Sequence, residues 1–147
     1  IPFFWSLFLL LFLSILIPYI LSKRTIDTEE SKRRKSTKIA IKRLKNAKIC
    51  LKNNDFDSFF EEIEKSLWGY FADKFNVNSS KLSKETIEEY FNKNQISSDL
   101  QNQFIKILSV CEFARYSPSS ERFKKMEETL EKAKLIIVEV ESNLKRK

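Results

Sequence analysis

The stretch VCEFARYSP, residues 110–118, carries the side chains that could most readily do chemistry: the thiol of Cys111, the carboxylate of Glu112, the guanidinium of Arg115 and the phenol of Tyr116. Catalysis by a cysteine needs an exposed thiolate and a nearby base. The chain has no histidine, which removes the usual base and the usual partner of cysteine in mixed metal sites. We therefore expect no catalytic, cofactor-binding or metal site, and no enzyme activity.

Helical periodicity predicts a structural role for this stretch instead. At about 100° per residue, Cys111 lies on an apolar face, so we expect a buried and unreactive thiol. The other residues of that face are Leu100, Phe104, Ile107, Leu108 and Ala114. Phe113 points to the opposite side, which predicts that the helix is covered on more than one face. Glu112 and Arg115 are predicted to pair, and Arg115 and Tyr116 to tie the helix end to a neighbouring loop.

The two cysteines of the chain, Cys50 and Cys111, lie far apart in the sequence and form no CxxC pair. One disulfide between them is an open alternative. We predict two free thiols in a reducing compartment, because nothing in the sequence requires the bond.

Residues 1–22 predict a transmembrane helix. The segment holds no charged residue, and about 20 apolar residues suffice for the ~30 Å hydrocarbon core. Trp5 and Tyr19 stand near its ends, as aromatic side chains do at membrane interfaces. A signal peptide is less favoured because no positive charge precedes the apolar run. A soluble core helix is less favoured because the segment is apolar on every side.

A basic stretch follows the apolar one. Residues 23–52 hold twelve Lys and Arg against three Asp and Glu, which places this side in the cytoplasm by the positive-inside rule. Residues 53–147 are nearly neutral. We expect the basic charge to meet anionic lipid headgroups rather than nucleic acid. The predicted membrane-interface residues are Trp5, Tyr19, Lys23, Arg24, Arg33 and Arg34.

Glycine occurs once and proline three times, too few for the turns of a β fold, so we predict an all-α chain. Apolar periodicity predicts helices over about 31–52, 55–75, 83–94, 98–116 and from 119 or 120 onward. Ser98 and Gln101 stand at capping-box spacing. The domains expected are thus a transmembrane helix over 1–22, a basic juxtamembrane segment over 23–37 and a cytoplasmic bundle of about five helices over 38–147.

The first two cytoplasmic helices predict an antiparallel hairpin like a single tetratricopeptide unit. Ala40, Leu44, Ala47 and Leu51 form a narrow apolar stripe on the first helix. Gly69 stands inside the second, where glycine costs about 1 kcal/mol relative to alanine. Close packing of a helix or ring explains this glycine most simply, and a hinge or a partner contact is the alternative.

The last helix carries a heptad pattern, with apolar residues at alternating spacings of three and four. This pattern favours packing against the other helices, and a homotypic coiled coil is the alternative. The residues of the pattern are Phe123, Met126, Leu130, Ala133, Ile137, Val140 and Leu144.

Two runs in this order, SLWGYFADKFNVNSSKLSKETI and CEFARYSP, resemble the C-terminal region of BatD, of the Bacteroides aerotolerance (oxygen-tolerance) family. The likeness extends back through KIAIKRLKNAK and the apolar segment. Its most specific part is Trp68-Gly69-Tyr70 together with Cys111 to Pro118. These residues are expected to be a structural signature or a partner contact.

The resemblance implies a signal peptide, extracytoplasmic β-sandwich-like domains, one membrane helix and a cytoplasmic helical tail. It also implies partners such as von Willebrand A-domain membrane proteins, tetratricopeptide proteins or a MoxR-type ATPase, and a role in aerotolerance or envelope stress. It implies no catalytic residue.

We therefore expect a non-catalytic, membrane-anchored scaffold subunit of a Bat-type complex in the bacterial inner membrane, with residues 23–147 in the cytoplasm. The alternative is a sensor or relay subunit that passes an extracytoplasmic stress signal to cytoplasmic partners. No cofactor is expected for either.

Overall fold

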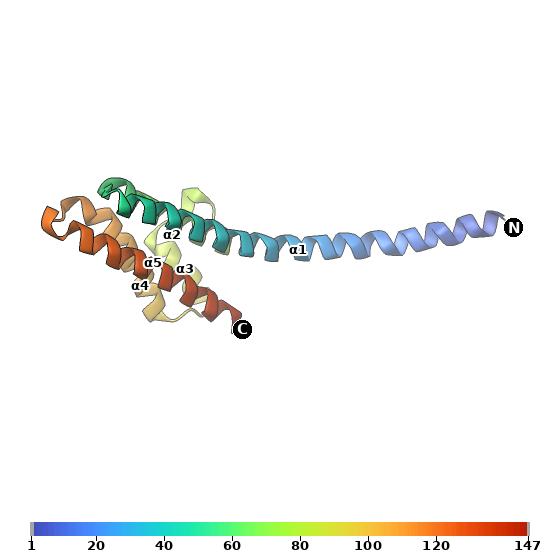
Figure 1. Cartoon of the computed structure of the whole chain (residues 1–147). Coiled ribbons are helices and arrows are strands. Elements are labelled where there is room, and N and C mark those ends of the chain that lie inside the picture. The colour runs from blue at the N-terminus through green and yellow to red at the C-terminus, as the bar shows by residue number, and fades with distance from the viewer. Residues whose placement is uncertain (1, 147) are drawn as a thin grey trace. The chain divides into compact units, whose positions relative to one another are not determined.

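The computed structural model describes the backbone of residues 2–146, and the side chains of these residues except 2, 3, 20–30, 32, 33, 36, 115 and 119. Its regular elements are all helices and none of the described residues lies in a strand, which confirms the all-α prediction (Figure 1). The elements are α1 (Pro2–Lys52), α2 (Phe56–Phe75), η1 (Ser79–Lys81), α3 (Lys84–Lys93), α4 (Ser98–Phe113), η2 (Ala114–Tyr116), η3 (Ser119–Glu121) and α5 (Arg122–Lys145).

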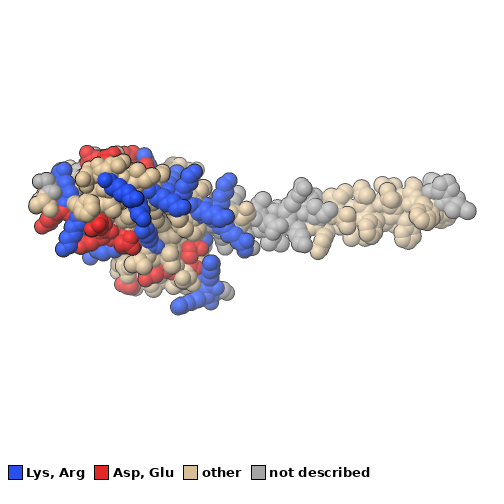
Figure 2. Space-filling view, in the orientation of Figure 1, with Lys and Arg blue, Asp and Glu red and all other residues tan. Residues whose placement is uncertain are grey.

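The chain divides into two compact units, residues 1–34 and residues 35–147. In the first unit, the side chains of residues 4–19 are all exposed and none is charged (Figure 2). Among the described residues, no helix is long and apolar enough to cross a membrane, although the sequence predicts such a helix over 1–22. At about 1.5 Å per residue, the run 4–19 is shorter than a ~30 Å hydrocarbon core. The side chains of 1–3 and 20–22 lie outside the described residues.

The second unit is a helical bundle with one hydrophobic core, to which the last turns of α1 and all of α2 to α5 contribute. Phe71 of α2 is fully buried at its centre. Its ring contacts five other aromatic rings at centroid distances of 5.1 to 6.5 Å. Those rings belong to Trp68, Phe75, Tyr90, Phe91 and Phe104. Burial of each such large side chain stabilises the fold by about 1.5–3 kcal/mol.

The hairpin of α1 and α2 is as predicted, and the small residues explain how closely the helices approach. Ala40, Leu44 and Ala47 are all buried. Ser66 of α2 is also buried, and its Oγ donates a hydrogen bond of 2.8 Å to the carbonyl oxygen of Ala40. A side chain larger than alanine at position 40 would separate the two helices and break this bond.

Side-chain caps begin the helices of the bundle. Asp55 accepts a hydrogen bond from the amide of Ser58 at the start of α2, and Ser83 accepts one from the amide of Thr86 at the start of α3. Such caps satisfy amides that have no partner within the helix. At α4 the cap is Ser97 rather than Ser98. The capping-box prediction is wrong, because Gln101 is buried and its Oε1 accepts no hydrogen bond from a described residue.

Helix α5 packs against α2 and α4, which confirms that the heptad face is used within the bundle. Phe123 is the exception, since it is 51% exposed. It stands in the first turn of α5, beyond the point where α4 has ended. Thr129 and Ile136 are buried as well, so the buried stripe is wider than a heptad seam.

Candidate functional site

The thiol of Cys111 faces the core, as predicted. Burial, together with the negative charges of Glu64 and Glu112, raises the pKa of this thiol to about 12. The thiol therefore stays protonated at neutral pH and is a poor nucleophile. Cys50 is half-buried, and burial together with Asp55 and Glu62 raises its pKa as well. Both cysteines are free.

Glu112 pairs with a residue of another helix. Lys84, at the start of α3, donates hydrogen bonds to Glu112 Oε2 at 2.9 Å and to Ser109 Oγ at 3.1 Å. This bridge joins α3 to α4. The predicted partner of Glu112 was Arg115, whose side chain lies outside the described residues. Sequence spacing could suggest an intrahelical pair but not a lysine 28 positions away.

The predicted clasp at the end of α4 is wrong for Tyr116, which is 84% exposed. The polar contacts at this corner centre on Ser117 instead. Lys125 Nζ donates to Ser117 Oγ at 2.8 Å, and Arg122 Nε donates to the Ser117 carbonyl at 3.4 Å. Phe113 is 64% exposed, so the expectation that α4 is covered on a second face is also wrong for the described residues.

Gly69 is explained by an arginine of α1. A Cβ at position 69 would lie 3.2 Å from Nη1 of Arg43. That Nη1 donates a hydrogen bond of 3.0 Å to the carbonyl oxygen of Lys65, one turn earlier in α2. The packing interpretation of this glycine is thus confirmed, with a guanidinium in the place of the expected helix or ring. The neighbouring Trp68 is half-buried and packs edge-on against Phe71.

Tyr70 belongs to a polar cluster that joins three helices. Its hydroxyl donates a hydrogen bond of 2.6 Å to Oε1 of Glu141 in α5. Lys74 of α2 forms an ion pair of 2.5 Å with the same oxygen. Thr37 of α1 also hydrogen-bonds Glu141. The side chains of Lys74 and Glu141 are only 8% and 16% exposed.

The protonation of this cluster follows from its contacts. Burial pushes the pKa of Glu141 upward, but hydrogen bonds from Lys74, Tyr70 and Thr37 and the charge of Lys74 outweigh it, so the pKa is lowered. Burial, the hydrogen bond to Glu141 and the carboxylate charge raise the pKa of Tyr70. At neutral pH the cluster is a fixed carboxylate with its donors already in place. It can hold helices together, but it offers no group for proton transfer.

Sequence reasoning missed Arg43, Lys74 and Glu141. The sequence does carry a signal for Lys74 and Glu141, because both are charged residues next to positions of a buried apolar face. Lys74 lies between Phe71 and Phe75. A charge at the edge of such a face must be paired or reach solvent.

The predicted membrane-interface residues fall in and around the first unit. Trp5 and Tyr19 are exposed, and Arg34 is exposed. The side chains of Lys23, Arg24 and Arg33 lie outside the described residues.

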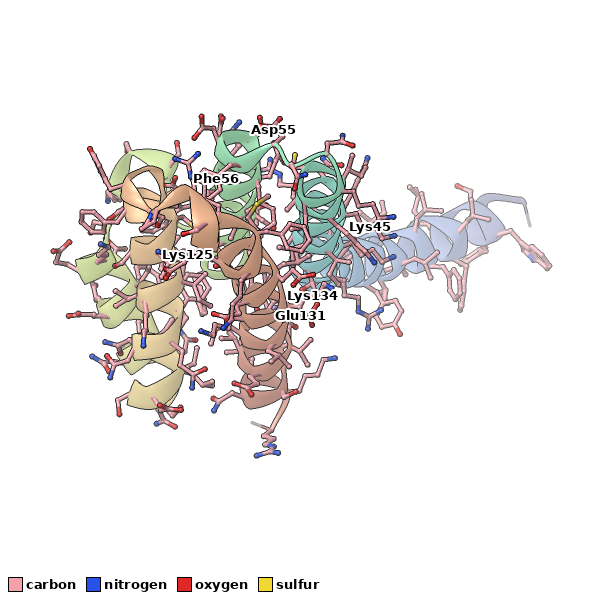
Figure 3. The ribbon with its side chains drawn as sticks, turned by 60° about the vertical axis from the view of Figure 1, so that its left-hand side comes forward. Lys45, Asp55, Phe56, Lys125, Glu131 and Lys134 are labelled. Atoms are coloured by element: carbon pink, nitrogen blue, oxygen red, sulfur yellow. The ribbon has the colours of Figure 1, made fainter. Side chains whose placement is uncertain are left out.

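Two open grooves run along α5, one on each side. The first, of about 370 Å³, lies between α4 and α5 and is lined by Gln103, Lys106, Ile107, Val110, Lys125, Glu128, Thr129 and Lys132. The second, of about 610 Å³, lies between α1 and α5 and is lined by Lys48, Leu51, Glu127, Glu128, Leu130, Glu131, Lys132, Lys134 and Leu135. Figure 3 shows α5 between α4 and the last turns of α1, with Glu131 and Lys134 labelled on α5 and Lys45 on α1.

Within the part of the chain that the structure describes, no three His, Cys, Asp or Glu side chains gather where they could hold a metal ion. Comparison with protein-family models, with curated proteins and with solved structures finds no match to this chain.

Proposed function

We propose that this chain is a non-catalytic, membrane-attached interaction subunit whose helical bundle binds an acidic amphipathic segment of a partner protein. The groove between α4 and α5 is the observation that carries the proposal. The apolar segment of residues 4–19 supports the attachment to a membrane. Water is a poor environment for a helix with apolar side chains on every side, since each large one gains about 1.5–3 kcal/mol on burial.

The groove between α4 and α5 combines an apolar floor with a basic rim. Ile107 and Thr129 form much of the floor and are almost fully buried, and Val110 is half-buried. Three lysines and one glutamate line the rim. Two of these lysines, Lys106 and Lys132, are exposed and form no ion pair with a described residue. An amphipathic helix with apolar residues on one side and carboxylates beside them complements such a groove.

The family-level part of the proposal rests on the residues quoted from the sequence. We place the chain in a Bat-type complex of the bacterial inner membrane, with residues 23–147 in the cytoplasm. The segment bound by the groove then belongs to a von Willebrand A-domain membrane protein, a tetratricopeptide protein or a MoxR-type ATPase. The hairpin of α1 and α2 would be its tetratricopeptide-like element, and the basic segment after the membrane would contact anionic headgroups.

A binding experiment tests the groove. The full chain is placed in phosphatidylcholine nanodiscs and titrated against a fluorescent synthetic helix of about four turns, with leucines on one side and glutamates on the other. We expect saturable binding that weakens about 10-fold in a Lys106→Glu/Lys132→Glu variant, because two attractive contacts become repulsive. A Lys81→Glu/Lys145→Glu variant changes the net charge equally and should bind like the unmodified chain.

Equal weakening in the two variants would show that only net charge matters and would count against the groove. Binding that does not saturate would count against docking as a whole. Membrane attachment has a separate readout, flotation of the chain with phosphatidylcholine vesicles. A Phe8→Asp/Phe12→Asp variant should lose that flotation, because charged side chains are costly in the hydrocarbon layer.

A further inference from the structure

The face that α5 shares with α1 is built differently from the groove proposed to bind a partner. Its groove is lined by three leucines, Leu51 of α1 and Leu130 and Leu135 of α5. The apolar surface continues past the groove to Val138, and Leu135 and Val138 are 58% and 59% exposed.

Helical register places further residues of α1 on this face. Thr37 hydrogen-bonds Glu141 of α5, and Lys48 and Leu51 line the groove. Ile41 is four residues after Thr37 and seven before Lys48, so it falls on the same side of α1. Ile41 is exposed. An apolar strip thus runs along the junction of the two helices, open to solvent within unit 35–147.

Charge is divided unequally between the two helices of this face. Residues 35–52 of α1 include no Asp or Glu, and Lys45, Lys48 and Lys52 recur along one side of it at spacings of three and four. The α5 side of the groove carries Glu127, Glu128 and Glu131 together with Lys132 and Lys134. Glu131 is paired with Lys134 at 2.9 Å, while Glu127 and Glu128 form no ion pair with a described residue.

We propose that this face, with Lys45 and Lys48 on α1 and Glu127 and Glu128 on α5, binds the same face of a second copy of the chain. A two-fold axis parallel to the helices would pack α1 of each copy against α5 of the other. Such a rotation does not shift either copy along the axis, so residues that are level with each other in one copy stay level across the interface. Lys45 and Lys48 of one copy would then face Glu127 and Glu128 of the other, because Lys48 already lies level with those glutamates within one copy. The apolar strips of the two copies would then pack against each other and be buried in the interface.

The same axis satisfies two general requirements. A contact between identical faces closes on itself, so it yields a pair and not a filament. An axis parallel to the helices also keeps residue 35 of both copies at the same end of the pair. Both preceding segments can therefore reach one membrane, where confinement raises the effective concentration of the copies.

Charge reversal on one helix at a time tests this pairing in the full chain, solubilised in mild detergent. Lys45→Glu/Lys48→Glu places glutamates on both sides of the proposed contact, and Glu127→Lys/Glu128→Lys places lysines on both sides. Light scattering with chromatography, and energy transfer between copies tagged at the C-terminus, would measure association. We expect the unmodified chain to pair, and each variant alone to associate at least about 10-fold more weakly because like charges then face each other.

An equimolar mixture of the two variants is the decisive sample. Both helix contacts are restored between a copy of one variant and a copy of the other, so the mixture should pair at least as tightly as the unmodified chain. A Lys81→Glu/Lys145→Glu control should pair normally, and circular dichroism checks that each variant is folded. The proposal is overturned if the unmodified chain is monomeric, if the mixture does not associate, or if charge reversal leaves association unchanged. The last result would assign pairing to another segment. Glu128 lines both grooves, so binding of the acidic helix to the groove between α4 and α5 is compared between the unmodified chain and Lys45→Glu/Lys48→Glu, whose changed residues do not line that groove.

Discussion

Replacing Glu141 by glutamine should destabilise the bundle strongly, because three donors converge on this one carboxylate. Tyr70 and Lys74 both contact Oε1, and the side chain of Lys74 is only 8% exposed. Glutamine keeps the shape but leaves the lysine with no counter-charge in a site that is nearly closed to water. Removing one partner of a buried ion pair costs about 3–5 kcal/mol of stability. Because Glu141 is still 16% exposed, we expect Glu141→Gln to lower the free energy of unfolding by about 2–4 kcal/mol.

Urea unfolding of the chain in mild detergent, followed by far-ultraviolet circular dichroism, would measure this loss. Glu139→Gln is the matched control, since Glu139 is an exposed acid of the same helix and such surface changes usually stay within about 0.5 kcal/mol. Tyr70→Phe should cost about 1.5–3 kcal/mol, because it removes a hydrogen bond to a charged group. Combining it with Glu141→Gln should cost less than the sum of the two, since both changes remove the same contact. Equal stability of Glu141→Gln and Glu139→Gln would refute the reasoning.

Three further predictions concern pH, the glycine and the thiols. The pKa of Glu141 is lower in the folded state than its ordinary value. The stabilisation that Glu141 provides is therefore present above the ordinary carboxyl pKa and is lost as pH falls through the lowered value. The free energy of unfolding, measured from pH 7 to pH 3, should fall less steeply in Glu141→Gln than in the unmodified chain. Gly69→Ala should raise the free energy of unfolding by about 1 kcal/mol in an Arg43→Ala background and by less when Arg43 is present. Urea unfolding of the unmodified chain, the two single variants and the double variant would measure both gains. An equal gain in the two backgrounds would contradict the contact between Arg43 and position 69. At pH 7.5 a thiol reagent should modify Cys50 at least about 10-fold faster than Cys111 in the folded chain, with similar rates in urea, and equal rates in the folded chain would contradict the burial of Cys111.

Helix ends were largely predictable from the sequence, because caps and breakers act over a few residues. Ser83 begins α3 where a serine precedes an apolar-periodic run, and the predicted range 55–75 differs from α2 by one residue at its start. The cap of α4 was misplaced by one residue, from Ser97 to Ser98, because two adjacent serines offer the same hydroxyl. Choosing between them depends on which one leaves its backbone extended.

Exposure at the corner between α4 and α5 was not predictable in the same way. Phe113, Tyr116 and Phe123 were expected to pack or to form a clasp, and all three are exposed. Of the three, only Phe123 follows the periodicity of a buried face. Burial also needs a neighbouring element at that position, and among the described residues none covers these three side chains. The residue that organises the corner is Ser117, whose two donors come from the following helix.

By itself the sequence determined the helical class, the ranges of the helices after residue 52 to within a few residues, the apolar face that buries Cys111 and the absence of an imidazole base, since each follows from composition or from a periodicity of a few residues. The predicted helix start near residue 31 was wrong, because α1 is one helix over Pro2–Lys52. Only the tertiary structure decided that Arg43 lies over Gly69, that Lys74 and Tyr70 converge on Glu141, and that grooves flank α5 on both sides. These features join residues from different helices, and such contacts depend on how the helices pack, which a local pattern does not encode.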